Sequence, residues 1–112
     1  MNARSRQARQ TLRNRTRSQR AAARIARNGT GTLATHALAA GLTPRQASSV
    51  ASSLRKNAAK LGIQGQAGTA YRKGQARTCT RYTARQVAAI AVIYRPRKPM
   101  YVQAAARLAL AA

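Results

Sequence analysis

The sequence contains no aspartate and no glutamate, although it is 112 residues long and has 22 lysine and arginine residues. In soluble domains about a quarter of all residues are charged, and both signs are present. A formal net charge of +22 makes a compact chain repel itself, and no acidic side chain is present to relieve that repulsion. The counter-charge must come from a partner, and the phosphate backbone of nucleic acid is the commonest dense anion in a cell.

The lack of carboxylates also excludes most catalytic chemistry. No acidic side chain can act as a general acid or base, orient a catalytic histidine, or hold Mg²⁺ or Ca²⁺. The chain has one histidine, His36, and one cysteine, Cys79, whereas a zinc site takes about four ligands. We therefore predict that the protein is not an enzyme and needs no cofactor or metal. His36 is expected to be a packed or half-exposed helix residue, and Cys79 a small half-buried strand residue.

Large apolar side chains are scarce, since tryptophan and phenylalanine are absent and alanine dominates the apolar residues. Such a core buries little area per residue, so we expect modest stability in a single small domain. A lone cysteine cannot form an internal disulfide, which favours a reducing compartment. No apolar run approaches the roughly 18 residues of a membrane span, and no apolar stretch follows the basic N-terminus as in a secretory signal. We expect a cytoplasmic protein.

Residues 1–30 form an arginine-rich arm. Its arginines are Arg4, Arg6, Arg9, Arg13, Arg15, Arg17, Arg20, Arg24 and Arg27. So few sizeable aliphatic side chains cannot offset the entropy of ordering, so we predict that the arm is disordered when free, with a helix only from Ser18 to Arg27. The arginines are predicted to contact phosphates in a groove. The alternative is a solvated tail that only aids solubility. Residues 28–31, Asn-Gly-Thr-Gly, predict a flexible hinge.

Residues 32–112 have the pattern of one small domain, mainly α with a small β-hairpin. Residues 32–40 predict a short helix that stops at Gly41. Residues 43–46, Thr-Pro-Arg-Gln, and 83–86, Thr-Ala-Arg-Gln, are capping boxes that predict two further helix starts. The first of these helices is predicted to end at Gly62, and Pro99 is predicted to open a last helix through Leu110.

The hairpin is predicted between the two capping boxes. Residues 69–72 and 76–82 are expected to be its strands, and residues 73–75, Lys-Gly-Gln, its basic tip. Residues 64–68 are expected to be a loop. Among the tyrosines, Tyr82 and Tyr94 occupy predicted core positions, whereas Tyr71 beside the tip is the best candidate to stack on a base.

Residues 33–52 resemble a helix-turn-helix, with small Ala37 at the helix crossing, Gly41 in the turn, and Leu42, Ala47 and Val50 at inner positions. His36 stands where an aliphatic residue is usual. Residues 71–90 resemble the basic wing and following helix of MerR-type and excisionase-type winged-helix proteins. These families share an Arg-x-Tyr-Thr/Ser-x-x-x-Val start, and Arg81, Tyr82, Thr83 and Val87 match it without the spacer residue after arginine.

The resemblance implies a winged helix-turn-helix, preceded by the disordered basic arm, in which the helix from Pro44 enters the major groove of DNA. The residues expected to face base edges are Arg45, Ser48 and Ser49. Lys56 and Lys60 are expected to lie along phosphates, and Ser52, on the same helix face, is a further residue expected to bind nucleic acid. The wing is expected to contact the backbone or minor groove through Arg72, Lys73 and Arg77, and Tyr71 and Arg81 are further residues expected to bind nucleic acid. An ordinary solvated helix face is the alternative for residues 45–60.

The sequence thus favours a small DNA-binding regulator of transcription, replication or recombination on a mobile element such as a phage or plasmid, associated with the bacterial nucleoid. One alternative is an RNA binder, because the arm resembles the arginine-rich segments of lambdoid-phage antiterminators. Another is a genome-condensing nucleoprotein packaged in a virion. A homodimer is a further prediction.

The last residues, Leu-Ala-Leu-Ala-Ala, resemble the Leu-Ala-Ala end of the bacterial tag that directs stalled products to the ClpXP protease. The resemblance implies a degron at Ala111 and Ala112. An alanine-rich helix that simply stops there is the favoured interpretation.

Overall fold

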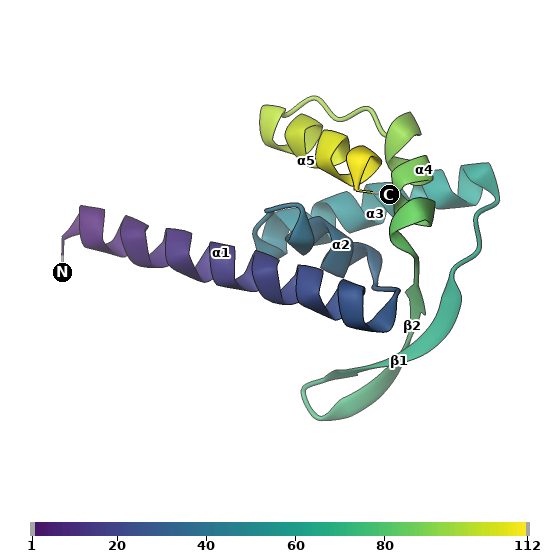
Figure 1. Ribbon diagram of the computed structural model, residues 1–112, viewed down its shortest axis with the longest axis horizontal. Helices are drawn as coiled ribbons and strands as arrows, with labels where there is room; N and C mark the ends of the chain where they lie inside the picture. The colour runs from purple at the N-terminus through teal and green to yellow at the C-terminus, as the bar shows by residue number, and fades with distance from the viewer. Residues whose placement is uncertain (1, 112) are drawn as a thin grey trace.

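The computed structural model describes residues 2–111, apart from the side chain of Arg72. In this part of the chain five helices and one two-stranded sheet follow one another (Figure 1). The helices are α1 (Ala3–Asn28), α2 (Leu33–Ala39), α3 (Pro44–Leu61), α4 (Ala84–Ile93) and α5 (Pro99–Leu110), and the strands are β1 (Gln66–Arg72) and β2 (Gln75–Arg81). The prediction of a mainly helical chain with one small hairpin is confirmed.

The disordered arm is not confirmed, because α1 is one continuous helix of 26 residues. The Asn2 side chain caps its start by accepting a hydrogen bond from the Ser5 N–H at 2.8 Å, and Gly29 ends it in a left-handed conformation, φ 75°. The inner half packs on α2: Ala21 is fully buried, and Ser18 Oγ donates to the Ala39 carbonyl at 3.1 Å. This packing coincides with the only part of the arm for which the sequence predicts a helix.

Both capping boxes begin helices as predicted. Thr43 accepts from the backbone of Gln46, whose side chain in turn accepts from the Thr43 N–H at 3.1 Å. The same reciprocal pair starts α4, where the Thr83 N–H donates to Gln86 Oε1 at 2.9 Å. Helix α3 ends at Gly62 and α5 runs from Pro99 to Leu110, both as predicted. Helices α3 and α4 begin at these positions because each satisfies its own free N-terminal amides locally, whereas α5 begins with proline and has no side-chain cap.

The hairpin is longer than predicted. The strands pair antiparallel from Gln66 with Arg81 to Arg72 with Gln75, so the predicted loop over residues 64–68 is wrong from residue 66 onward. Pairing with β2 draws these weak strand formers into the ladder, because strand preference depends on cross-strand neighbours. Lys73 and Gly74 make a two-residue turn in which both have positive φ, 53° and 75°, as a tight hairpin with right-handed twist requires. The hairpin extends away from the helices (Figure 1).

The core lies between α2, α3, α4 and α5. Its largest fully buried side chains are Leu54, Ile90, Val50 and Val87, and much of the remainder is alanine. Tyr82 is buried, as predicted, and Tyr94 is half-buried against the same core. The hairpin base joins this body because the N–H and C=O of Gly31 both bond to the backbone of Tyr82, at 3.0 and 2.8 Å. The predicted hinge is therefore fastened at Gly31 rather than free.

Helices α2 and α3 meet at a short turn over residues 40–43. Gly41 has φ 101°, and a Cβ added there would lie 2.8 Å from Arg107 Nη1. Arg107 Nη1 donates to the Ala40 carbonyl at 2.8 Å, so α5 satisfies the C-terminal end of α2. Glycine is favoured at position 41 by its backbone conformation, and a larger residue would also displace the end of the Arg107 side chain.

Candidate nucleic-acid interface

The outward face of α3 is cationic and exposed. Residues 47, 50, 51, 54 and 58 turn inward to the core, so the positions between them face solvent. The exposed set comprises Arg45, Ser48, Ser49, Ser52, Arg55, Lys56 and Lys60. The structure therefore brings together all six predicted residues of this helix on one face.

Two of the serines on this face are already hydrogen-bonded within the helix. Ser49 Oγ donates to the Arg45 carbonyl at 3.4 Å and Ser52 Oγ donates to the Ser48 carbonyl at 3.3 Å. Each hydroxyl keeps its lone pairs as acceptors. Arg45 lies in the first turn of α3, where a side chain projects beyond the end of the helix rather than over its side.

The hairpin presents its two faces differently. The register places Tyr71, with 79% of its surface exposed, on the face that also carries Thr69 and Thr78. Arg77 and Arg81 lie on the opposite face, because alternate residues of a strand point to opposite sides. Lys73 is exposed at the turn. Tyr71 and Arg77 therefore do not form one surface, and a flat partner would meet one or the other.

Arg81 differs from the other predicted wing residues because it is half-buried. Its side chain lies along β1, where a Cβ added at Gly68 would be 2.9 Å from Arg81 Nε. Its aliphatic stem covers the strand and leaves less of the guanidinium for a ligand. The prediction for the side chain of Arg72 lies outside the described residues.

Sequence reasoning missed Arg55, an exposed residue of α3 on the side toward the hairpin. It lines a hollow of about 290 Å³ together with Thr78, Cys79 and Thr80 of β2 and residues at the start of α2. Arg55 stands three residues after Ser52 and seven after Ser48, so helical spacing alone identifies it as a member of the same face. Cys79 is half-buried, as predicted.

The arginines of α1 are not spread evenly around the helix. Seven of the nine succeed one another at intervals of three or four residues and so form one stripe, which we call the arginine stripe: Arg6, Arg9, Arg13, Arg17, Arg20, Arg24 and Arg27. Arg4 and Arg15, about three turns apart, both lie on the other flank of the helix. Ala22 and Ile25 lie on the side of α1 that faces the other helices. They line a pocket together with residues of α2, α4 and α5.

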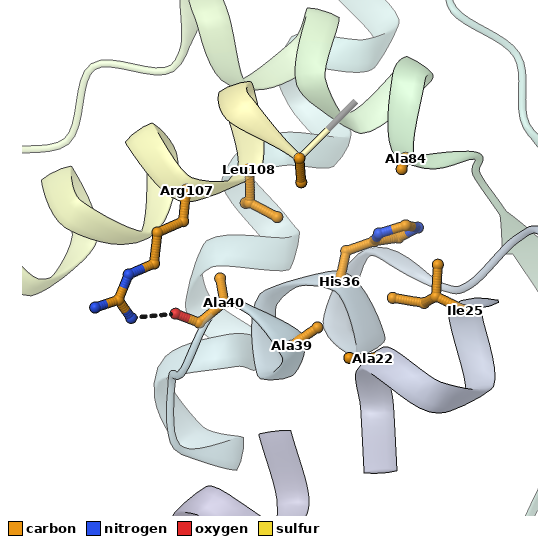
Figure 2. Close-up of a pocket in the computed structure, with 9 residues that line it drawn as sticks. Ala22, Ile25, His36, Ala39, Ala40, Ala84, Arg107 and Leu108 are labelled. Atoms are coloured by element: carbon orange, nitrogen blue, oxygen red, sulfur yellow. Dashed lines mark hydrogen bonds between the residues drawn. The ribbon is translucent and has the colours of Figure 1, made fainter. Parts of the chain in front are cut away.

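Figure 2 shows that pocket, a hollow of about 260 Å³ lined mostly by alanine and other apolar side chains. Its polar groups are already engaged. Arg107 bonds the Ala40 carbonyl, and His36, only 3% exposed, places Nε2 2.8 Å from the Tyr82 carbonyl oxygen. Because a carbonyl only accepts, Nε2 carries the proton and donates it. Nothing in this lining assembles a nucleophile with a base.

Burial lowers the pKa of His36 from its ordinary value of 6.5, although the hydrogen bond to Tyr82 opposes that shift. The neutral imidazole is therefore the form that the fold favours. His36 ties α2 to the base of the hairpin and acts as a packed residue, as predicted.

No group of three or more histidine and cysteine side chains that could hold a metal is found among the described residues. None of the helices described is both long enough and apolar enough to span a bilayer. Comparisons of the chain with protein-family models, with curated proteins and with solved structures find no match.

Proposed function

We propose that the protein is a small DNA-binding regulator of winged helix-turn-helix type, acting in transcription, replication or recombination on a mobile element. One observation carries the proposal. The exposed cations of α3 include Arg55, which lines a hollow together with β2 of the hairpin, in a chain with no acidic side chain to neutralise them. The order of elements also supports it, since α2 and α3 meet at a tight turn and the hairpin and α4 follow.

In this proposal α3 enters the major groove with its N-terminal turn toward the bases. Arg45 bonds a guanine edge, for which a forked guanidinium is suited. Lys56 and Lys60, farther along the same face, contact phosphates. Lys73 and Arg77 of the hairpin lie against the neighbouring backbone or minor groove.

The salt dependence of binding tests the proposal. With about 6–10 phosphate contacts, affinity for duplex DNA should fall by about 10³–10⁵ between roughly 50 and 200 mM salt, because each contact releases condensed counterions. A nearly flat dependence contradicts nucleic-acid binding. Selection from random DNA and RNA pools at physiological salt then identifies the target, and a sequence-specific regulator should prefer its site by about 10³ or more over unrelated DNA.

The RNA-binding alternative keeps one observation in its favour. The outer half of α1 is an exposed arginine-rich helix, and such segments bind folded RNA. Competition separates the candidates: an RNA binder prefers hairpin RNA over any duplex DNA, whereas a genome-condensing protein prefers neither. A preference for hairpin RNA overturns the DNA proposal.

Two further predictions belong with the proposed regulator. A homodimer would match a two-fold symmetric DNA site, and sedimentation of the free protein and of its DNA complex measures it. The ClpXP degron involves Ala111, which is exposed after the end of α5, and Ala112, which lies outside the described residues. Replacing both with Asp should lengthen the half-life in bacteria after synthesis is blocked, and an unchanged half-life contradicts the degron.

A further inference from the structure

The outer half of α1 has no packing of its own. From Ala3 to Arg13 every side chain is exposed, and the first half-buried residue is Asn14. In Figure 1 this half projects beyond the rest of the molecule, and α1 packs mainly on α2. Most helical stability in proteins comes from packing of one face, so these turns need another source of stability.

The arginine stripe runs the whole length of this helix. It extends from Arg6 to Arg27, which is about 31 Å at 1.5 Å per residue, and it stays within about 80° around the helix axis at 3.6 residues per turn. Neighbours three or four residues apart stand about 5–6 Å from one another. The stripe is therefore a straight, one-sided row of forked cations.

The same row destabilises the free helix. Like charges three or four residues apart repel, and Arg4 and Arg6 add positive charge at the end of the helix where the dipole is already positive. The chain has no acidic side chain that could lie between these arginines and reduce their repulsion. A line of anions along the stripe would turn each repulsion into attraction, because every guanidinium could then pair with a phosphate.

We propose that the arginine stripe binds one sugar-phosphate backbone of a DNA duplex from outside the grooves, and that this contact stabilises the outer half of α1 as a helix. The proposal rests on the proposed function and adds a second DNA contact to that of α3. A helix that lies deep in a groove has a row of phosphates on each side. Outside the arginine stripe only Arg4 and Arg15 could meet a second row, so a single backbone fits the arrangement better. A membrane surface fits poorly, because Leu12 is the only large aliphatic residue of the outer half.

Two charge-matched variants of the full chain test the position of the contact. Arg9→Gln with Arg13→Gln removes two charges from the stripe, and Arg4→Gln with Arg15→Gln removes two charges from the opposite flank of the same turns. On one duplex, the first variant should reduce the slope of log affinity against log salt by about 1.8, or about 0.9 per lost contact. The second should change it little. Equal losses overturn the one-sided stripe and leave the proposed function intact.

Two proline variants test the coupling to helix structure without changing charge. Ala8→Pro interrupts the helix, whereas Ala3→Pro places proline at the first helical position, where it is tolerated. Amides of residues 5–13 should gain protection from hydrogen exchange when duplex DNA is added, and Ala8→Pro alone should abolish that gain and weaken binding. Unchanged protection in the unaltered protein overturns the coupling. No binding by the unaltered protein at low salt overturns both this inference and the proposed function.

Discussion

Helix α1 and the body formed by α2 to α5 are both helical, yet different forces hold them. The body encloses Val50, Leu54, Val87 and Ile90, so apolar burial stabilises it whatever the ions in solution. In α1 only Ala21 is fully buried, and its charges oppose the helix. The chain therefore combines a part that its own core stabilises with a part that, in our proposal, a bound DNA backbone stabilises.

The largest expected effect comes from removing the part of α1 without packing. Deleting residues 1–13 takes away four arginines and, among residues 2–13, only exposed side chains, so affinity for every duplex should fall alike, by up to about 10⁴-fold at roughly 50 mM salt. Thermal unfolding of the shortened chain should be unchanged. A loss confined to one DNA sequence would show that α1 reads bases. Deleting residues 1–28 is a poorer test, because it also removes Ala21 and Ile25 from α2.

A substitution in the core should instead lower the stability of the fold. Leu54→Ala removes a fully buried side chain and should lower the free energy of unfolding by about 2–5 kcal/mol. Leu12→Ala is the matched control, because Leu12 is 60% exposed and should have almost no effect. Denaturant titration of both variants measures the difference. Similar losses would mean that the outer half of α1 packs on the body in solution.

Within the proposed DNA interface, the first turn of α3 should differ from its last. Arg45→Ala should cost about 1–3 kcal/mol at the preferred site and relax the choice of base there, whereas Lys60→Ala should weaken binding to all sequences alike. Binding of each variant to matched and mismatched duplexes separates the two outcomes. If Arg45→Ala leaves discrimination unchanged, α3 is not the recognition helix.

The smallest expected effect concerns pH. Because burial lowers the pKa of His36, the unfolded chain takes up a proton near pH 6.5 more readily than the folded chain does. The stability that neutral His36 contributes is therefore complete above about pH 6.5 and is lost as the pH falls toward the lower folded pKa. His36→Gln keeps a donor for Tyr82 and should flatten the dependence of the melting temperature on pH in this range. An identical pH profile in both proteins would contradict a role for His36.

Local signals in the sequence were enough to predict α3, α4 and α5. The capping boxes at Thr43 and Thr83 and the proline at position 99 act on the residues beside them, so the helix starts follow without knowledge of the fold. The outward face of α3 follows from the same helical period. The seven-residue spacing from Ser48 to Arg55 extends that face toward the hairpin.

Features that depend on distant contacts could not be predicted. The sequence predicts a helix only from Ser18 to Arg27, the half of α1 that packs on α2, whereas the continuation of the helix back to Ala3 has no packing that a sequence pattern could indicate. Residues 66–68 become strand because Thr80 and Arg81 pair with that segment. The hydrogen bond from His36 to Tyr82 spans 46 residues, and no local pattern indicates it.

The Tyr82 carbonyl oxygen has a mechanical consequence. It accepts hydrogen bonds from both Gly31 and His36, so the linker after α1, the helix α2 and the residue that follows β2 share one anchoring atom. A tilt of the hairpin about its base displaces this atom and pulls on the segment that carries α1. The hairpin and the segment that follows α1 are thus fixed to one backbone atom, so that in the proposed complex a force on one is transmitted to the other.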